Sequence, residues 1–230
     1  MYVYLPYGYD ENGTDRYPVI YFFHGRGCDP TTLLCNPETK NAFDHMISTG
    51  VAKPFILVAP TYYYDARHLL YDWEQFPREM REEIMPLVES TYRTYAETAD
   101  EAGFRASRDH RAICGFSMGS MTTWALFPYM LDVSASFLPF SGPMQDTEAM
   151  IAAVEKNEEP FYIYMACGGA EDLAFENCNA LAQTLAADPH FSYGPSREEN
   201  NFFYCLSDNI HQDLTSRYYL YNAFLDGLFQ

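Results

Sequence analysis

Short apolar runs alternate along the chain with longer stretches in which apolar residues recur at every third or fourth position. The runs predict β-strands at residues 2–5, 19–23, 55–59, 111–115, 135–140, 161–166 and 202–206. Several are apolar at nearly every position, which is typical of parallel strands buried on both faces. Their alternation with helical stretches predicts an α/β fold, a mostly parallel sheet covered by helices.

The helical stretches carry apolar stripes, which we expect to pack on the sheet. Pro86 lies near the end of the first such helix and should kink it. The stripes are Phe76, Met80, Ile84, Leu87, Val88 and Tyr92; Cys178, Leu181, Ala182 and Leu185; and Leu214, Tyr218, Tyr221, Leu225 and Leu228. Between the first two predicted strands, Asn12-Gly13 suits a tight turn, so we expect these strands to pair antiparallel.

Length and composition indicate one globular domain over residues 1–230, with 48% hydrophobic and 20% charged residues. The 14 Lys and Arg against 32 Asp and Glu give a net charge of −18. This charge argues against nucleic acid and anionic membranes as partners, because both require a cationic surface. No apolar run approaches the roughly 18 residues of a membrane-spanning helix.

The N-terminus has neither a basic start nor an apolar signal core. We therefore expect a secreted protein if a signal or a neighbouring domain has been trimmed, and a cytoplasmic one otherwise. Among the six cysteines, no spacing suits a metal site, and we expect most to be buried thiols, with a Cys28–Cys35 bridge as the alternative. Aromatic residues reach 17% of the chain, and we expect most in the core and some on a ring-stacking surface.

The segment most informative about chemistry is Gly115-Phe116-Ser117-Met118-Gly119, which follows an apolar strand and precedes a helical pattern. This context predicts a nucleophile elbow, where a strained turn lifts the serine hydroxyl clear of the sheet. Small residues two before and two after Ser117 would let strand and helix approach closely. The first N–H groups of the helix would then point at developing negative charge.

A serine nucleophile needs a base, and the base needs an orienting acid. His211 follows the last predicted strand, at the sheet edge where the elbow also opens, and is the candidate base. Asp172 follows the preceding strand and is the candidate acid, with Glu171 and Asp208 as rivals. The order Ser117, Asp172, His211 is that of the α/β-hydrolases.

The loop His24-Gly25-Arg26-Gly27 follows an early strand and is a candidate oxyanion loop. We expect N–H donors from Arg26 or Gly27, and from Met118 after the nucleophile. Substrate contacts are expected from side chains at the same sheet edge. These candidates are His24, Tyr62, Tyr63, Tyr64, Tyr71, Trp73 and Ser141.

Together these residues resemble the esterase D-type α/β-hydrolases, especially family 1 carbohydrate esterases such as feruloyl and acetylxylan esterases. The resemblance runs from Tyr2 to Phe229. Its carriers are Val3-Tyr4-Leu5-Pro6 with Gly8-Tyr9-Asp10; Tyr17-Pro18-Val19-Ile20-Tyr21 leading into His24-Gly25; Gly115-Phe116-Ser117-Met118-Gly119; Cys167-Gly168 with Asp172 and Glu176-Asn177; and His211 with Tyr219-Leu220-Tyr221-Asn222. It implies an α/β-hydrolase fold without a large lid, a triad of Ser117, His211 and Asp172, and no required cofactor or metal.

Some positions depart from the family pattern. Ser120 and Ile210 stand where family members often have glycine, and Asp213 and Ser216 stand where aromatic rings frequently follow the histidine. The chain also begins where the family domain commonly has preceding strands.

The resulting hypothesis is an esterase that acts on acylated plant polysaccharide or a small phenolic ester, releasing ferulate or acetate. The alternatives are formylglutathione hydrolysis, siderophore-ester hydrolysis, acyl transfer to a sugar, and a non-catalytic glycan-binding relative. Composition and motifs leave the oligomeric state open.

Overall fold

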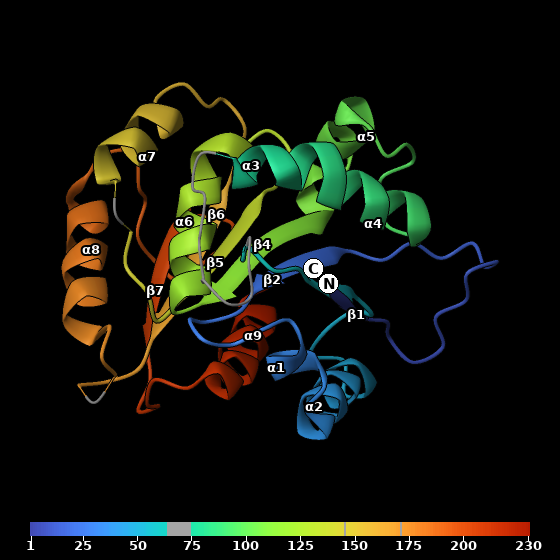
Figure 1. Cartoon of the computed structure of the whole chain (residues 1–230). Helices are drawn as coiled ribbons and strands as arrows, with labels where there is room; N and C mark the ends of the chain where they lie inside the picture. Colours follow the sequence, from blue (N-terminus) through green and yellow to red (C-terminus); the bar gives the residue numbers. More distant parts are fainter. Residues whose placement is uncertain (64–74, 145, 171) are drawn as a thin grey trace.

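A computed structural model of the chain describes residues 1–63, 75–144, 146–170 and 172–230 (Figure 1). Within these residues the sheet has seven strands in the order β1-β3-β2-β4-β5-β6-β7. All neighbouring pairs are parallel except β1 with β3. The strands are β1 (Tyr2–Tyr4), β2 (Val19–Phe23), β3 (Ile56–Ala59), β4 (Arg111–Phe116), β5 (Ser136–Phe140), β6 (Tyr162–Cys167) and β7 (Phe202–Leu206).

The strand prediction is confirmed, and each observed strand begins and ends within one residue of its predicted bounds. The predicted hairpin is wrong. Asn12 and Gly13 do lie in a turn, in which both N–H groups donate to Asp10. β1, however, pairs antiparallel with β3, with Tyr4 opposite Leu57. The long connection after β1 lets this strand lie at the edge of the sheet, beside β3.

Helices cover both faces of the sheet (Figure 1). Alternate residues of β2 explain the two layers, since Val19, Tyr21 and Phe23 face one core cluster and Ile20 and Phe22 the other. One face carries α3 (Phe76–Glu79), α4 (Met85–Thr91), α5 (Glu101–Ala106), α6 (Met118–Met130), α7 (Thr147–Val154) and α8 (Phe175–Ala187). The other carries α1 (Thr31–Leu34), α2 (Pro37–Ser48) and α9 (Ser216–Leu225).

Near Pro86, where a kink was expected, the structure has a π-helical turn, Met80–Ile84 (η1), between α3 and α4. The Met85 N–H donates to the carbonyl of Met80, one residue further back than in an α-helix. Proline has no N–H to continue the regular ladder, which explains the wider turn before it. On this segment Phe76, Met80 and Val88 are buried as predicted, whereas Leu87 is exposed.

The stripe predicted for the C-terminal helix is wrong in phase at Tyr218, Tyr221 and Leu225, whereas Leu228, which follows the helix, is buried as predicted. The helix buries Ser216, Tyr219, Leu220, Ala223 and Phe224 against the sheet. Tyr218, Tyr221 and Leu225 therefore face outward. The stripe on α8, from Cys178 to Leu185, is buried as predicted.

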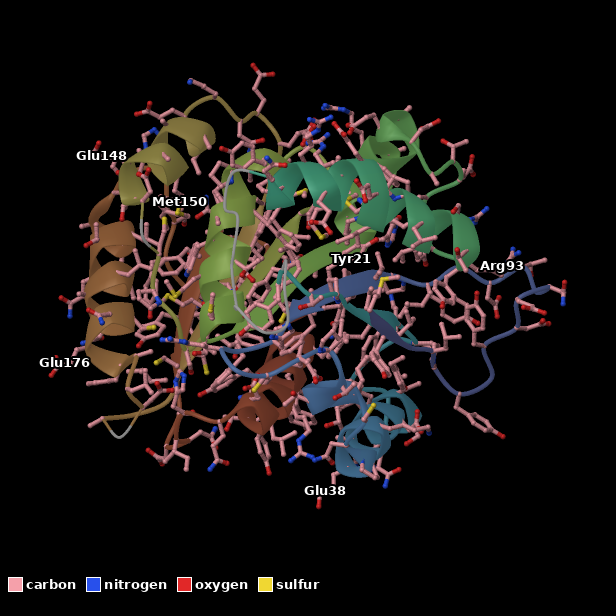
Figure 2. The ribbon with its side chains drawn as sticks, in the orientation of Figure 1. Tyr21, Glu38, Arg93, Glu148, Met150 and Glu176 are labelled. Atoms are coloured by element: carbon pink, nitrogen blue, oxygen red, sulfur yellow. The ribbon has the colours of Figure 1, made fainter. Side chains whose placement is uncertain are left out.

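A buried ion pair lies at the end of the sheet where β4 begins. Arg111 donates two hydrogen bonds of 2.7 Å to the carboxylate of Glu89. Glu89 also accepts from the hydroxyls of Tyr21 and Thr94. Figure 2 shows Tyr21 inside the molecule, whereas Glu38 and Glu148 project from its surface.

All six cysteines are free thiols, so no Cys28–Cys35 bridge is present. Cys114, Cys167 and Cys178 are buried as expected, whereas Cys35 is exposed and the other two are half-buried. Among the described residues, no helix is long and apolar enough to cross a membrane. The same residues contain no group of three or more His, Cys, Asp or Glu side chains that could hold a metal ion.

Candidate active site

The turn between β4 and α6 has the strained backbone expected of a nucleophile elbow. Ser117 adopts φ 57° and ψ −115°, a left-handed conformation that is rare for residues with a side chain. A Cβ at Gly119 would overlap the carbonyl oxygen of Phe23, and one at Gly115 would overlap the backbone of Gly119. The two glycines therefore let β4, α6 and the end of β2 approach closely, which holds Ser117 at the turn.

Three side chains from separate loops meet at this turn in a hydrogen-bonded chain. The Oγ of Ser117 lies 2.8 Å from Nε2 of His211. The Nδ1 of the same ring lies 2.8 Å from Oδ1 of Asp172. The ring of Phe116 packs against the imidazole, with ring centroids 4.7 Å apart. The residues that the sequence places at the ends of β4, β6 and β7 are thus brought within hydrogen-bonding distance of one another.

Asp172 is held firmly beside His211. It is buried, and its carboxylate accepts hydrogen bonds from the N–H groups of Gly168 and Ala174. Burial by itself raises the pKa of Asp172, but the hydrogen bonds from His211 and Ala174 outweigh it, so the pKa lies below its ordinary value. Of the rival acids, Asp208 is exposed, and Glu171 lies outside the described residues.

The loop after β2 is held in place by contacts with other loops. The Gly27 N–H donates to the hydroxyl of Tyr63 at 2.8 Å. The Nδ1 of His24 lies 2.9 Å from the carbonyl of Gly25, and its Nε2 lies 3.0 Å from the hydroxyl of Thr61. Gly27 is therefore already engaged, and among the hydrogen bonds of the described residues none uses the Arg26 N–H.

His24 and Tyr62 occupy different places from those expected of substrate contacts. His24 is 2% exposed and Tyr62 is 4% exposed, and their rings stack with centroids 4.7 Å apart. The Tyr62 hydroxyl donates to the carbonyl of His24 at 2.6 Å. Burial lowers the pKa of His24, which favours its neutral form. Both side chains support the loop from inside the protein, because their polar atoms are already paired there.

The other expected contacts divide into three groups. Tyr63 is half-buried, and its hydroxyl serves the loop through Gly27. Ser141 is buried at 1% exposure, in a left-handed conformation with φ 49°, so it offers little surface to a ligand. The predictions for Tyr64, Tyr71 and Trp73 fall outside the described residues.

Asp213 is a contributor to the site that the sequence analysis noted only as a departure. Its Oδ1 accepts the Gly25 N–H at 3.0 Å, and its Oδ2 accepts the Cys28 thiol at 2.9 Å. A Cβ at Gly25 would lie 2.8 Å from the same carboxylate. Asp213 lies two residues after His211, so this carboxylate links the segment that carries the histidine to the loop after β2. No signal in the sequence indicated this contact, because Asp213 lies 188 residues after Gly25 in the chain.

The departure at Ser120 is also accommodated. Ser120 is fully buried, and its hydroxyl donates to the carbonyl of Gly142 at 2.8 Å. The indole N–H of Trp124 donates to the same carbonyl at 3.2 Å. A Cβ at Gly142 would overlap the Ser117 carbonyl, so these bonds hold the segment after β5 tightly against the elbow.

Comparisons with known proteins identify relatives of the chain. Residues 1–177 match the family model named Esterase. The chain is 34% identical over 232 residues to endo-1,4-beta-xylanase Y of Acetivibrio thermocellus, covering 96% of this chain and 21% of the relative. It is 26% identical to an endo-1,4-beta-xylanase/feruloyl esterase of Xylanibacter ruminicola, covering 80% of this chain and 24% of the relative. The chain thus spans about a fifth to a quarter of the curated relatives it matches.

Among solved structures, a mutant of the feruloyl esterase module from Clostridium thermocellum, complexed with sinapinate, is 32% identical with a TM-score of 0.89. The match covers 99% of this chain and 83% of that one. A ferulic acid esterase from Anaeromyces mucronatus, at 22% identity and a TM-score of 0.72, shows the same fold over 99% of this chain and 83% of that one. With its α/β-hydrolase sheet, its serine elbow and the family match over most of its length, the chain belongs to the esterase family.

Proposed function

We propose that the protein is a serine esterase that removes feruloyl or acetyl groups from xylan, with Ser117, His211 and Asp172 as its catalytic triad. The observation that carries this proposal is the pair of 2.8 Å contacts that joins Ser117 to His211 and His211 to Asp172. The likeness to a feruloyl esterase module at 32% identity supports the same chemistry.

In the proposed mechanism, Nδ1–H of His211 donates to Asp172, so Nε2 is free to accept the Ser117 proton. Ser117 Oγ attacks the ester carbonyl, and the C–O bond to the sugar alcohol breaks as His211 returns the proton to the leaving oxygen. Water then attacks the acyl-enzyme, with His211 again acting as the base, and the acid is released. Asp172 stays ionised throughout, in keeping with its lowered pKa.

The oxyanion of each tetrahedral intermediate needs N–H donors that are free. We assign this role to Met118, the first residue of α6, whose N–H has no partner one turn earlier in the helix. Arg26 is the second donor, in preference to Gly27, because the Gly27 N–H is donated to Tyr63. Because Gly119 has no Cβ, the first turn of α6, which carries Met118, can lie against the end of β2, from which the Arg26 loop leaves.

A neutral, partly apolar acyl group fits the surroundings of the triad. Leu173 follows Asp172 and Ile210 precedes His211 in the chain, and they are 77% and 44% exposed, which makes them the candidates for apolar contact with the acyl group. The net charge of −18 disfavours anionic esters. Since Asp213 takes a position where the family often has an aromatic ring, we assign contact with the acyl group to such aliphatic side chains.

The test compares the protein with Ser117→Ala on a chromogenic acetate ester, on methyl ferulate and on acetylated xylan. We expect hydrolysis by the unaltered protein and a loss of about 10⁶-fold in the variant, as when a triad nucleophile is removed. Equal rates for the two proteins would overturn the role of Ser117. Failure on both methyl ferulate and acetylated xylan would overturn the substrate class.

A further inference from the structure

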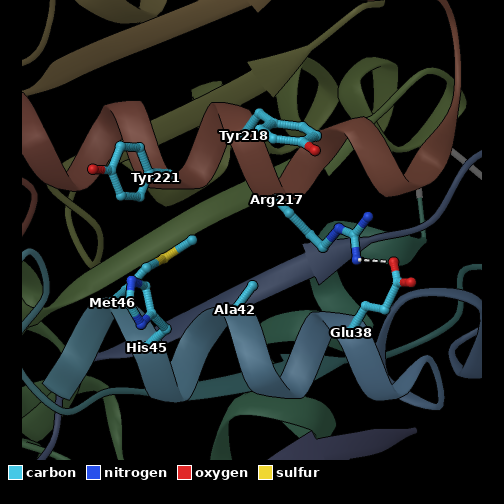
Figure 3. A pocket seen from close by; sticks show the side chains of 7 residues that line it. All are labelled: Glu38, Ala42, His45, Met46, Arg217, Tyr218 and Tyr221. Carbon is cyan, nitrogen blue, oxygen red and sulfur yellow. Dashed lines mark hydrogen bonds and ion pairs between the residues drawn. The ribbon is translucent and has the colours of Figure 1, made fainter. Parts of the chain in front are cut away.

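A shallow groove lies between α2 and α9, on the face of the sheet opposite α6 (Figures 1 and 3). Its volume is about 260 Å³. Two facing helical stripes line it: Glu38, Ala42, His45 and Met46 from α2, and Arg217, Tyr218 and Tyr221 from α9. None of these residues belongs to the proposed triad, so the groove is a separate feature of the surface.

The groove exposes aromatic rings that have no packing role in the core. Tyr218 is 58% exposed and Tyr221 is 37% exposed, because α9 buries its opposite face against the sheet. The two residues lie one helical turn apart, and Figure 3 shows both rings on the side of α9 that faces the groove. An exposed tyrosine offers a rigid apolar face and a polar edge, which suits a ligand with both apolar and hydroxyl surfaces.

The charges of the groove are balanced within it. Arg217 Nη1 lies 3.2 Å from the carboxylate of Glu38 at one end, and Figure 3 shows His45 and Tyr221 toward the other. Glu38 cancels the positive charge of Arg217, so the groove has no free cation for an anionic ligand. The remaining hydrogen-bonding capacity of Glu38, Arg217 and His45 suits hydroxyl groups.

The size of the groove also limits the kind of ligand that it can bind. Stable protein partners bury about 800 Å² on each side, far more than two partly exposed tyrosines provide. Enclosed small-molecule pockets begin at about 300 Å³ and cover most of their ligand, whereas this groove is smaller and open. A segment of a longer neutral chain, lying across the rings with its ends in solvent, fits both limits.

We propose that this groove is a second carbohydrate-binding site, which holds an unesterified stretch of the main chain of a neutral polysaccharide. The inference rests on the proposed function, because the bound chain would be the polysaccharide whose esters are cleaved at Ser117. Tyr218 and Tyr221 stack on sugar rings, and the Arg217–Glu38 pair and His45 bind their hydroxyls.

The position of the groove links it to the proposed active site. Arg217 lies in the first turn of α9, directly after the 3₁₀ turn Asp213–Thr215 (η3), which carries Asp213. This turn packs against α1, the helix that precedes α2 and Glu38. The Arg217–Glu38 end of the groove is therefore the end nearer to the loops that hold His211 and Gly25. Binding there would keep a long substrate attached while its side groups reach Ser117.

The experiment compares the unaltered protein with Tyr218→Ala/Tyr221→Ala and with the control Tyr129→Ala, which removes a tyrosine of α6 with a similar exposure of 55%. Binding is measured by NMR titration with xylohexaose, and by retardation in gels that contain soluble arabinoxylan. Thermal unfolding of each variant checks its fold. We expect the double variant to lose about tenfold in affinity, a factor that corresponds to ~1.4 kcal/mol, while the control retains it. The KM on feruloylated arabinoxylan should rise in parallel, with methyl ferulate hydrolysis unchanged.

The binding measurements need no ester, so they separate this proposal from the proposed function. Loss of binding in the double variant would support the groove even if no ester were hydrolysed. Equal binding by the double variant and the unaltered protein would overturn it, as would the absence of any xylohexaose-induced shift of the tyrosine ring resonances of the unaltered protein.

Discussion

The carboxylate of Asp213 provides a direct test of how the loop after β2 is held for catalysis. Asp213→Ala removes the acceptor of the Gly25 N–H and of the Cys28 thiol, whereas Asp213→Asn keeps one oxygen for Gly25 and loses the charge. Neither substitution touches Ser117, His211 or Asp172. In the proposed mechanism, Asp213 therefore acts as a positioning residue for the N–H of Arg26, the proposed second oxyanion donor.

The magnitude follows from the bond that is lost. A hydrogen bond to a charged group contributes about 1.5–3 kcal/mol, more than one between neutral groups. If holding the loop uses this free energy only in the transition state, the alanine variant should lose about 10- to 150-fold in kcat. KM should change little, because the oxyanion exists only after attack on the carbonyl. The kcat of the asparagine variant should lie between those of the alanine variant and the unaltered protein, since asparagine keeps the hydrogen bond to Gly25 but loses the charge.

The thiol of Cys28 gives a second, independent measurement. Burial raises the pKa of Cys28, and the hydrogen bond and charge of Asp213 raise it further, to about 12. Asp213→Ala should lower this pKa, so Cys28 should react faster with iodoacetamide at pH 8. The measurement is made in a Cys35→Ser background, because Cys35 is exposed and would react as well.

Two outcomes would refute the reasoning about Asp213. The first is an alanine variant that keeps the kcat of the unaltered protein on methyl ferulate. The second is a Cys28 thiol whose reactivity does not change. A fall in thermal stability with kcat unchanged would show that Asp213 supports folding alone.

Two further predictions concern the fold. Glu89→Gln leaves the guanidinium of Arg111 buried beside a neutral group, and should cost about 3–5 kcal/mol. At ~2–4 °C for each kcal/mol, the midpoint of thermal unfolding should fall by roughly 6–20 °C. Burial lowers the pKa of His24 and His110, so both rings are harder to protonate in the native state than in the unfolded chain, where they gain protons below about pH 6.5. The free energy of unfolding should therefore fall as the pH drops through 6.5, and His24→Gln should reduce that slope.

Each of these predictions has a control. Arg78→Gln breaks an exposed pair with Glu82, and should leave the midpoint of thermal unfolding almost unchanged, because solvent screens such pairs. A similar small effect of Glu89→Gln would contradict the role given to the buried pair. Denaturant unfolding between pH 7.5 and 5.5 measures the histidine effect, and a slope that His24→Gln leaves unchanged would contradict it.

Much of the fold of this protein could be predicted from local patterns in the sequence. Each apolar run forms a strand in the structure, because the strands of a parallel sheet are covered on both faces and are therefore apolar at nearly every position. Ser117 could be singled out from its neighbours alone, since Gly115 and Gly119 mark a close approach of strand and helix. Asp172 and His211 were predicted to lie near Ser117 from their positions after later strands, because the ends of parallel strands meet at one edge of the sheet, and the structure places them within hydrogen-bonding distance.

Other features depended on contacts between distant segments, and only the tertiary structure decided them. The pairing of β1 with β3 was hidden, since a turn sequence does not reveal which strand lies at the edge. α9 carries apolar side chains on two faces, and the sheet selects Tyr219 and Leu220 for burial, which leaves Tyr218 and Tyr221 in the groove. The preference for Arg26 over Gly27 as the proposed oxyanion donor depends on the hydrogen bond from Gly27 to Tyr63, and the position of Asp213 depends on its hydrogen bond from Gly25. A periodic pattern describes a residue and its neighbours along the chain, whereas a hydrogen bond between loops depends on the whole sheet that brings them together.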